Sequence, residues 1–175
     1  MQTESNYETL HMTGDEALIK VRDMLKHFRN TMMITSANGF PHSRPMGLQG
    51  KAEEFDGTLW FFTDRSSRKV EEIRRTASIS LVFQSDSDSA YMHLFGRARV
   101  VDDPTKMEEL YSPLLKTWFP KGLDDPRLTL IRFEADNGDF WDSPGGILQV
   151  LAAFTKAVVT GKPGQGGEIG EVALT

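Results

Sequence analysis

The chain has 175 residues, enough for one domain with a sizeable core, and its 39% hydrophobic and 26% charged contents are those of an ordinary soluble globular protein. A net charge of −5 argues against general attraction to nucleic acid or to an anionic membrane, although a local basic patch could still hold a small anion. Because the chain has no cysteine, disulfides, thiolate nucleophiles, iron–sulfur clusters and cysteine-based zinc sites are excluded.

The chain alternates between strand-like and helix-like segments, with turn signals at short spacing. No internal repeat or domain linker is visible, so we expect a single domain over 1–175 with flexible ends. In chain order, the expected elements are a loose arm (1–12), a helix (14–29), strands (31–37, 42–50 and 59–63), a basic helix (66–75), strands (79–84 and 91–101), a helix (102–118), a strand (128–133), a tight turn (136–139), a helix (147–159) and a glycine-rich tail (161–175) with a short strand (172–174).

Three local signals add detail to this order. Asn38-Gly39 separates two strand-like runs and predicts a hairpin, because both central positions of a type I′ turn need positive φ. Pro45 places the second of these strands at a sheet edge or at a bulge, since proline cannot donate to the ladder. Gly96 indicates a bulge or a close approach of two backbones. Six strands interrupted by helices predict an α+β protein built on an antiparallel β-barrel.

The clearest functional signal lies where the strand ending at Asp64 runs into the basic helix. Ser66, Ser67, Arg68 and Lys69 bring hydroxyl and cationic donors to a helix start, which itself offers free N–H groups and a partial positive charge. This combination suits a phosphate dianion. The alternative is a solvated basic helix face, but cations at this end oppose the helix dipole, which favours a ligand. We assign Asp64 to capping or to the turn.

Other candidates are weaker when taken alone. Arg44 on a strand could hydrogen-bond a planar heterocycle or a phosphate, but a surface arginine on an edge strand is the simpler interpretation. Most aromatic residues are expected in the core, except Trp141, a partly exposed indole that could cover a pocket. The four histidines are scattered, so no metal site is expected, and no hydrolase or dinucleotide-binding motif is present.

The order of these motifs resembles that of the pyridoxamine 5′-phosphate oxidase-like FMN-binding split barrels, and most closely their general stress protein branch. The resemblance covers about 14–146. The segments that carry it are Arg44-Pro45-Met46, Trp60-Phe61-Phe62-Thr63-Asp64, Ser67-Arg68-Lys69, Gly96-Arg97-Ala98 and Phe140-Trp141-Asp142-Ser143-Pro144. It implies a six-stranded antiparallel split β-barrel and a homodimer with FMN at the subunit interface.

The resemblance also implies cofactor-binding roles for residues at matching positions. They are Ser67, Arg68 and Lys69 at the FMN phosphate; Phe62 and Thr63 facing the flavin; Arg44, Pro45 and Met46 beside the isoalloxazine ring; Tyr91, near a position that contacts FMN from the partner strand; and Trp141, which would reach the site from the other subunit.

Two departures bear on the activity. The true oxidases carry a lysine where this chain has Gln49, and they end in a tryptophan- and arginine-bearing segment that residues 166–175 lack. We therefore expect an FMN-binding flavoprotein, an oxidoreductase transferring electrons or hydride, rather than a pyridoxamine-phosphate oxidase. The alternatives are a non-catalytic flavin-binding or flavin-sensing stress protein, or a split barrel holding a deazaflavin or haem.

The expected setting follows from what the sequence lacks. Its polar N-terminus shows no signal peptide, and no run approaches the ~20 apolar residues of a membrane span. We expect a soluble cytoplasmic protein with no nucleic-acid or membrane partner.

Overall fold

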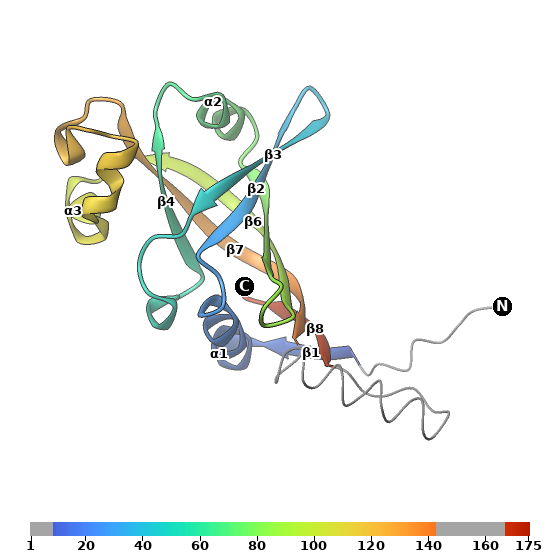
Figure 1. Cartoon of the computed structure of the whole chain (residues 1–175). Coiled ribbons are helices and arrows are strands. Elements are labelled where there is room, and N and C mark those ends of the chain that lie inside the picture. Colours follow the sequence, from blue (N-terminus) through green and yellow to red (C-terminus); the bar gives the residue numbers. More distant parts are fainter. Residues whose placement is uncertain (1–8, 143–166) are drawn as a thin grey trace, which may run out of the picture.

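The computed structural model describes residues 9–142 and 167–175 as one strongly bent sheet with helices at its ends and side (Figure 1). The strands are β1 (Thr9–Thr13), β2 (Asn30–Ala37), β3 (Phe40–Gly47), β4 (Thr58–Asp64), β5 (Ser78–Ser85), β6 (Ala90–Val101), β7 (Leu128–Asp142) and β8 (Glu168–Ala173). The α-helices are α1 (Gly14–Leu25), α2 (Arg68–Arg75) and α3 (Pro104–Leu110), and the short 3₁₀ helices are η1 (Ala52–Glu54), η2 (Pro113–Thr117) and η3 (Gly122–Asp124).

Strands β2 to β7 form the expected six-stranded antiparallel barrel. Their order is β4-β7-β6-β5-β2-β3, and the backbone N–H of Gln49, just beyond β3, donates to the carbonyl of Trp60 on β4 at 3.1 Å, which closes the ring. Strand β3 is thus an edge of the main ladder, which confirms the placement of Pro45. The hairpin prediction is also confirmed, because Asn38 and Gly39 have φ values of 53° and 80°.

The described residues contain two strands outside the six of the barrel. Strand β8 pairs antiparallel with the C-terminal half of β7, and β1 pairs parallel with β8. Residues 9–12 therefore do not belong to a loose arm, because Leu10 and Met12 alternate inward and pack on the core. The short strand expected at 172–174 is the longer β8. The helix expected at 147–159 lies outside the described residues.

The tight turn expected at 136–139 is wrong, since β7 runs unbroken through this segment. Asn137 and Gly138 pair with Phe95 and Leu94 in the ladder. Register shifts between Phe95 and Gly96, so that Asp136 is the extra residue of a bulge, which confirms the expectation for Gly96. Glycine at position 138 allows the backbones of β7 and β6 to approach closely, and it does not form a turn. A Cβ at this position would overlap the carbonyl of His93.

The long helix expected over 102–118 divides into α3 and η2. Helix α3 ends at Leu110 because Ser112, which precedes Pro113, has an extended backbone (φ −129°, ψ 140°). Asp103 caps the start of α3 by accepting from the backbone N–H of Lys106. The segment 111–127 therefore forms an irregular outer layer beside β4, and not a continuation of one helix (Figure 1).

Two apolar clusters hold these layers together. The larger fills the barrel and is capped at one end by α1, whose buried residues include Val21 and Met24. The smaller lies between β4, β7 and the η2 segment and comprises Phe62, Leu115, Phe119, Leu128 and Leu130. Because side chains alternate along a strand, Phe61 faces the barrel interior while its neighbour Phe62 faces this outer cluster. None of the described helices is long and apolar enough to cross a membrane.

Candidate ligand-binding cleft

A cleft of about 570 Å³ opens on the outer side of β4, at the end where α2 begins. Its volume falls within the roughly 300–1,000 Å³ usual for small-molecule sites. The lining residues come from β3, β4, α2, the η2 segment and their flanks: Asn30, Pro45, Met46, Gly47, Gln49, Phe62, Thr63, Asp64, Lys69, Leu115, Trp118, Phe119 and Arg127. Five of these, Pro45, Met46, Phe62, Thr63 and Lys69, were predicted as cofactor-binding residues from the sequence.

One end of the cleft is cationic because of Lys69. Its Nζ donates to Oγ1 of Thr63 at 3.0 Å, and Thr63 is only 3% exposed. Among the residues that the structure describes, Lys69 makes no ion pair. Burial, followed by the positive charge of Arg44, lowers the pKa of Lys69. A partly buried ammonium whose partner is a neutral hydroxyl favours an anionic ligand. The charge of such a ligand would offset both the burial of the ammonium and its repulsion by Arg44.

Hydroxyl and backbone donors lie beside this ammonium. Ser67 occupies the N-cap position of α2, yet its side chain makes no capping bond and lies 3.4 Å from Oγ1 of Thr63. Ser66 is committed elsewhere, because its N–H and hydroxyl both donate to Asp64, at 2.8 Å and 2.6 Å. These bonds, the hydroxyl first, lower the pKa of Asp64 and show it acting in the turn, as expected. Ser67 and Lys69 are thus placed together, and the donor set fits a phosphate group.

The two predicted arginines converge on a carboxylate behind the cleft. Arg44 Nη2 lies 2.9 Å and Arg68 Nε 2.8 Å from the carboxylate of Glu72, a residue of α2 that is 4% exposed. Thr35 donates to the same carboxylate at 2.5 Å, and Nδ1 of His42 lies 2.7 Å from it. Neither arginine lines the cleft.

The ionisation of Glu72 follows from this cluster of donors. Burial alone would raise its pKa, but the hydrogen bonds from Thr35 and His42 and the charge of Arg44 outweigh burial and lower the pKa to about 2. Two guanidinium groups therefore share one carboxylate, which leaves this side of the cleft with a positive potential. Sequence reasoning missed Glu72 because an acidic residue on a charged helix is usually exposed.

The other end of the cleft is apolar and aromatic. Pro45, Met46 and Phe62 come from β3 and β4, and Leu115, Trp118 and Phe119 come from η2 and the residues after it. Leu115 and Trp118 belong to the segment predicted as one helix over 102–118, and that prediction missed their role in the cleft. Pro113 was the available signal, since it interrupts that helix.

Tyr91 and Trp141 do not line the cleft of their own chain. They are register partners on β6 and β7 and are 40% and 45% exposed. The structure therefore does not bring these two predicted residues together with the five that line the cleft.

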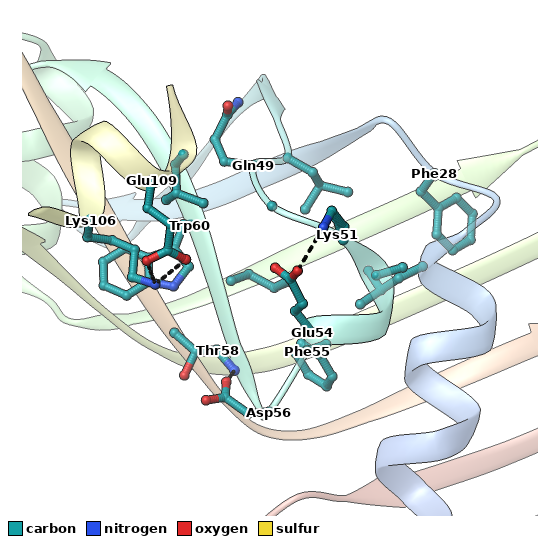
Figure 2. Close-up of a pocket in the computed structure, with 16 residues that line it drawn as sticks. Phe28, Gln49, Lys51, Glu54, Phe55, Asp56, Thr58, Trp60, Lys106 and Glu109 are labelled. Carbon is teal, nitrogen blue, oxygen red and sulfur yellow. Dashed lines mark hydrogen bonds and ion pairs between the residues drawn. The ribbon is translucent and has the colours of Figure 1, made fainter. Parts of the chain in front are cut away.

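A second, smaller hollow of about 150 Å³ lies on the other side of the Gln49–Trp60 contact (Figure 2). Its two lysines already have carboxylate partners: Lys51 pairs with Glu54 at 3.2 Å, and Lys106 with Glu109 at 2.7 Å. Because carboxylates neutralise both lysines, this hollow does not offer the unpaired ammonium that distinguishes the cleft at Lys69.

Comparisons with known proteins agree with this fold. The family model described as pyridoxamine 5′-phosphate oxidase like matches residues 16–164. The protein bli-3 of Neurospora crassa is 26% identical over 170 residues, covering 91% of this chain and 80% of the relative.

Many solved structures are similar, including the following two. A candidate general stress protein 26 from Jannaschia sp. CCS1 has a TM-score of 0.77 at 24% identity, covering 91% of this chain and 99% of that one, which shows the shared fold. A general stress FMN/FAD binding protein from Xanthomonas citri has a TM-score of 0.63 at 27% identity, covering 74% of this chain and 90% of that one. The expected split-barrel class and family are confirmed.

Proposed function

The chain belongs to the pyridoxamine 5′-phosphate oxidase-like family, and on that premise we propose that it is a flavoprotein that binds FMN in the cleft at Lys69. The observation that carries this proposal is the partly buried ammonium of Lys69, whose one hydrogen-bond partner within residues 9–142 and 167–175 is the hydroxyl of Thr63. Arg127, the other cation that lines the cleft, already pairs with Asp125 at 3.0 Å, so Lys69 is the cation of the cleft that a terminal phosphate would meet. The printed description of the Xanthomonas citri neighbour, an FMN/FAD binding protein, supports a flavin as ligand.

The residues of the cleft divide between the two ends of such a ligand. Lys69 would hold the phosphate, together with Ser67, which lies beside the cleft next to Thr63, and the N–H groups at the start of α2. Met46 and Phe62 would contact the ring along the strand side. When bound, the flavin supplies electron or hydride transfer, while the protein binds it, orients it and excludes water. Arg44 and Arg68 add positive potential from behind, since Glu72 neutralises only one of their two charges.

The proposal includes a homodimer with FMN at the subunit interface. It is supported by Tyr91 and Trp141, which are exposed and do not line the cleft of their own chain. Pyridoxamine-phosphate oxidation is not proposed, because Gln49 stands where the oxidases carry a lysine.

Titration of the purified protein with FMN tests the proposal. Absorbance and a thermal melt report binding, and a ligand at 100 times its Kd should stabilise the fold by about 2.7 kcal/mol. Lys69→Met should weaken FMN binding about tenfold to a hundredfold, because it removes a charge-assisted contact to the phosphate. Lys106→Met, a lysine of the neighbouring hollow that already pairs with Glu109, is the matched control and should bind FMN normally.

The outcomes separate the proposal from its alternatives. Wild-type protein that shows no FMN-dependent change, or a Lys69→Met variant that binds FMN as well as wild type, would refute it. Oxidation of NADH or NADPH by the FMN-loaded protein would support the oxidoreductase role over a flavin-storing or flavin-sensing one. Tighter binding of a deazaflavin or of haem would assign the cleft to that group instead.

A further inference from the structure

The segment that follows η2 contributes to the cleft an indole that is not packed in the apolar core. Leu115 and Phe119 are 8% and 7% exposed, whereas Trp118, which lies between them in sequence, is 69% exposed. All three line the cleft. The first two also pack in the cluster beneath β4, but Trp118 does not belong to that cluster.

The backbone fixes this arrangement. The N–H groups of Trp118 and Phe119 both donate to the carbonyl of Leu115, at 3.1 Å and 2.9 Å, and the N–H of Gly122 donates to the carbonyl of Phe119 at 2.8 Å. Since Leu115 and Phe119 are anchored inward, the turn presents Trp118 outward. Its exposure is thus a consequence of the fold and not of a loose segment.

A single exposed apolar side chain needs no explanation on its own. Trp118 differs because it lies on a cleft of ligand size, which Pro45 and Met46 also line. Its neighbour Leu114, 76% exposed on the same 3₁₀ helix, does not line the cleft. Tryptophan offers a large flat surface at small cost in side-chain entropy, and stacking on a planar ring adds to the area it buries.

We infer that Trp118 is a ring-binding residue, which stacks on the planar ring of the ligand whose phosphate Lys69 holds. This inference rests on the proposed flavin site and assigns the two halves of the ligand to different residues. Lys69 acts on the phosphate half of the ligand, and Trp118 acts on the ring half. The two residues should therefore respond differently to a ligand that has the ring but lacks the phosphate.

Binding of FMN and of riboflavin, which lacks the phosphate, tests this division. Trp118→Ala should weaken both ligands by the same factor, about tenfold to a hundredfold. Trp118→Phe should recover most of this loss, because a ring remains. Lys69→Met should weaken FMN and leave riboflavin unchanged. Leu114→Ala is the matched control and should bind both ligands as wild type does.

Fluorescence of the bound flavin gives a second readout. An indole stacked on the ring quenches flavin emission, so FMN bound to Trp118→Ala should be brighter than FMN bound to Leu114→Ala. A thermal melt without ligand should be the same for both variants, since both side chains are exposed.

The possible failures are distinguishable. If wild type binds neither flavin, the proposed function and this inference both fail. If wild type binds FMN but Trp118→Ala binds both flavins equally well, only the inference fails. A Trp118→Ala variant that changes the oligomeric state while keeping its flavin affinity would assign the indole to a second copy of the chain, and this too overturns the inference.

Discussion

Replacing Glu72 by glutamine should destabilise the protein in a way that depends on pH. The pKa of Glu72 is lowered from its ordinary 4.5 to about 2, and each unit corresponds to about 1.36 kcal/mol of stability. The full shift would amount to about 3 kcal/mol. Because Arg68 is 69% exposed and solvent screens its contact with Glu72, we expect 2–3 kcal/mol.

The sign follows from the direction of the pKa shift. A lowered folded-state pKa gives stability that is present above pH 4.5 and is lost as the pH falls towards 2. Glutamine has the shape of the protonated acid, so Glu72→Gln resembles the low-pH state of this side chain at every pH. Urea unfolding of wild type and variant should differ by 2–3 kcal/mol at pH 7 and converge near pH 2.

Glu71→Gln is the matched control on the same helix. Glu71 is 68% exposed and pairs only with Arg75, so its loss should cost less than about 1 kcal/mol. Other carboxylates with lowered pKa values act equally in all three proteins and cancel from the differences. A wild-type-to-variant difference that stays constant between pH 7 and pH 2 would refute the reasoning, and so would a Glu71→Gln effect of equal size.

Two further substitutions test the packing of the sheet and of α1. Gly96→Ala should lower the free energy of unfolding by about 2 kcal/mol or more in a thermal melt, because its Cβ would overlap a backbone carbonyl of β7. Gly47→Ala is the control. Its Cβ would have no neighbour closer than 3.6 Å, so the free energy of unfolding should change by less than about 0.5 kcal/mol. Lys20→Met should cost about 2–3 kcal/mol in urea unfolding, because Asp142 would lose a partner at 2.7 Å while both side chains are only 12% exposed. The exposed pair of Lys26 should contribute under about 1 kcal/mol, and equal losses for the two lysines would contradict this ranking.

The barrel could be predicted from sequence because its signals are local. Alternating burial along β5 and β6 repeats the period-two pattern of their residues, and Asn38-Gly39 encodes its own turn. The dipeptide at 137–138 has the same letters but pairs within β7. Whether such a dipeptide forms a turn or continues a strand depends on the neighbouring strand. That strand is a long-range contact, which a short window of sequence does not contain.

The residues of the candidate site also divide into those predicted from local sequence and those whose role depends on long-range packing. Lys69 and Thr63 were predicted together because a strand followed by a helix start brings them close within seven residues. Glu72 and Trp118 were missed, since the role of each depends on what packs against it from elsewhere in the chain. The residues named for the cofactor remain predictions until a ligand is bound.

The parallel pairing of β1 with β8 has a consequence for how the fold is completed. Thr9 lies opposite Ile169, so this contact closes a loop of about 160 residues. During synthesis the N-terminal part of the chain emerges first, and β1 has no partner until β8 has left the ribosome. The barrel strands can associate earlier, through nearer contacts such as β2 with β3 and β5 with β6. The seam between β1 and β8 is therefore the last part of the sheet to form.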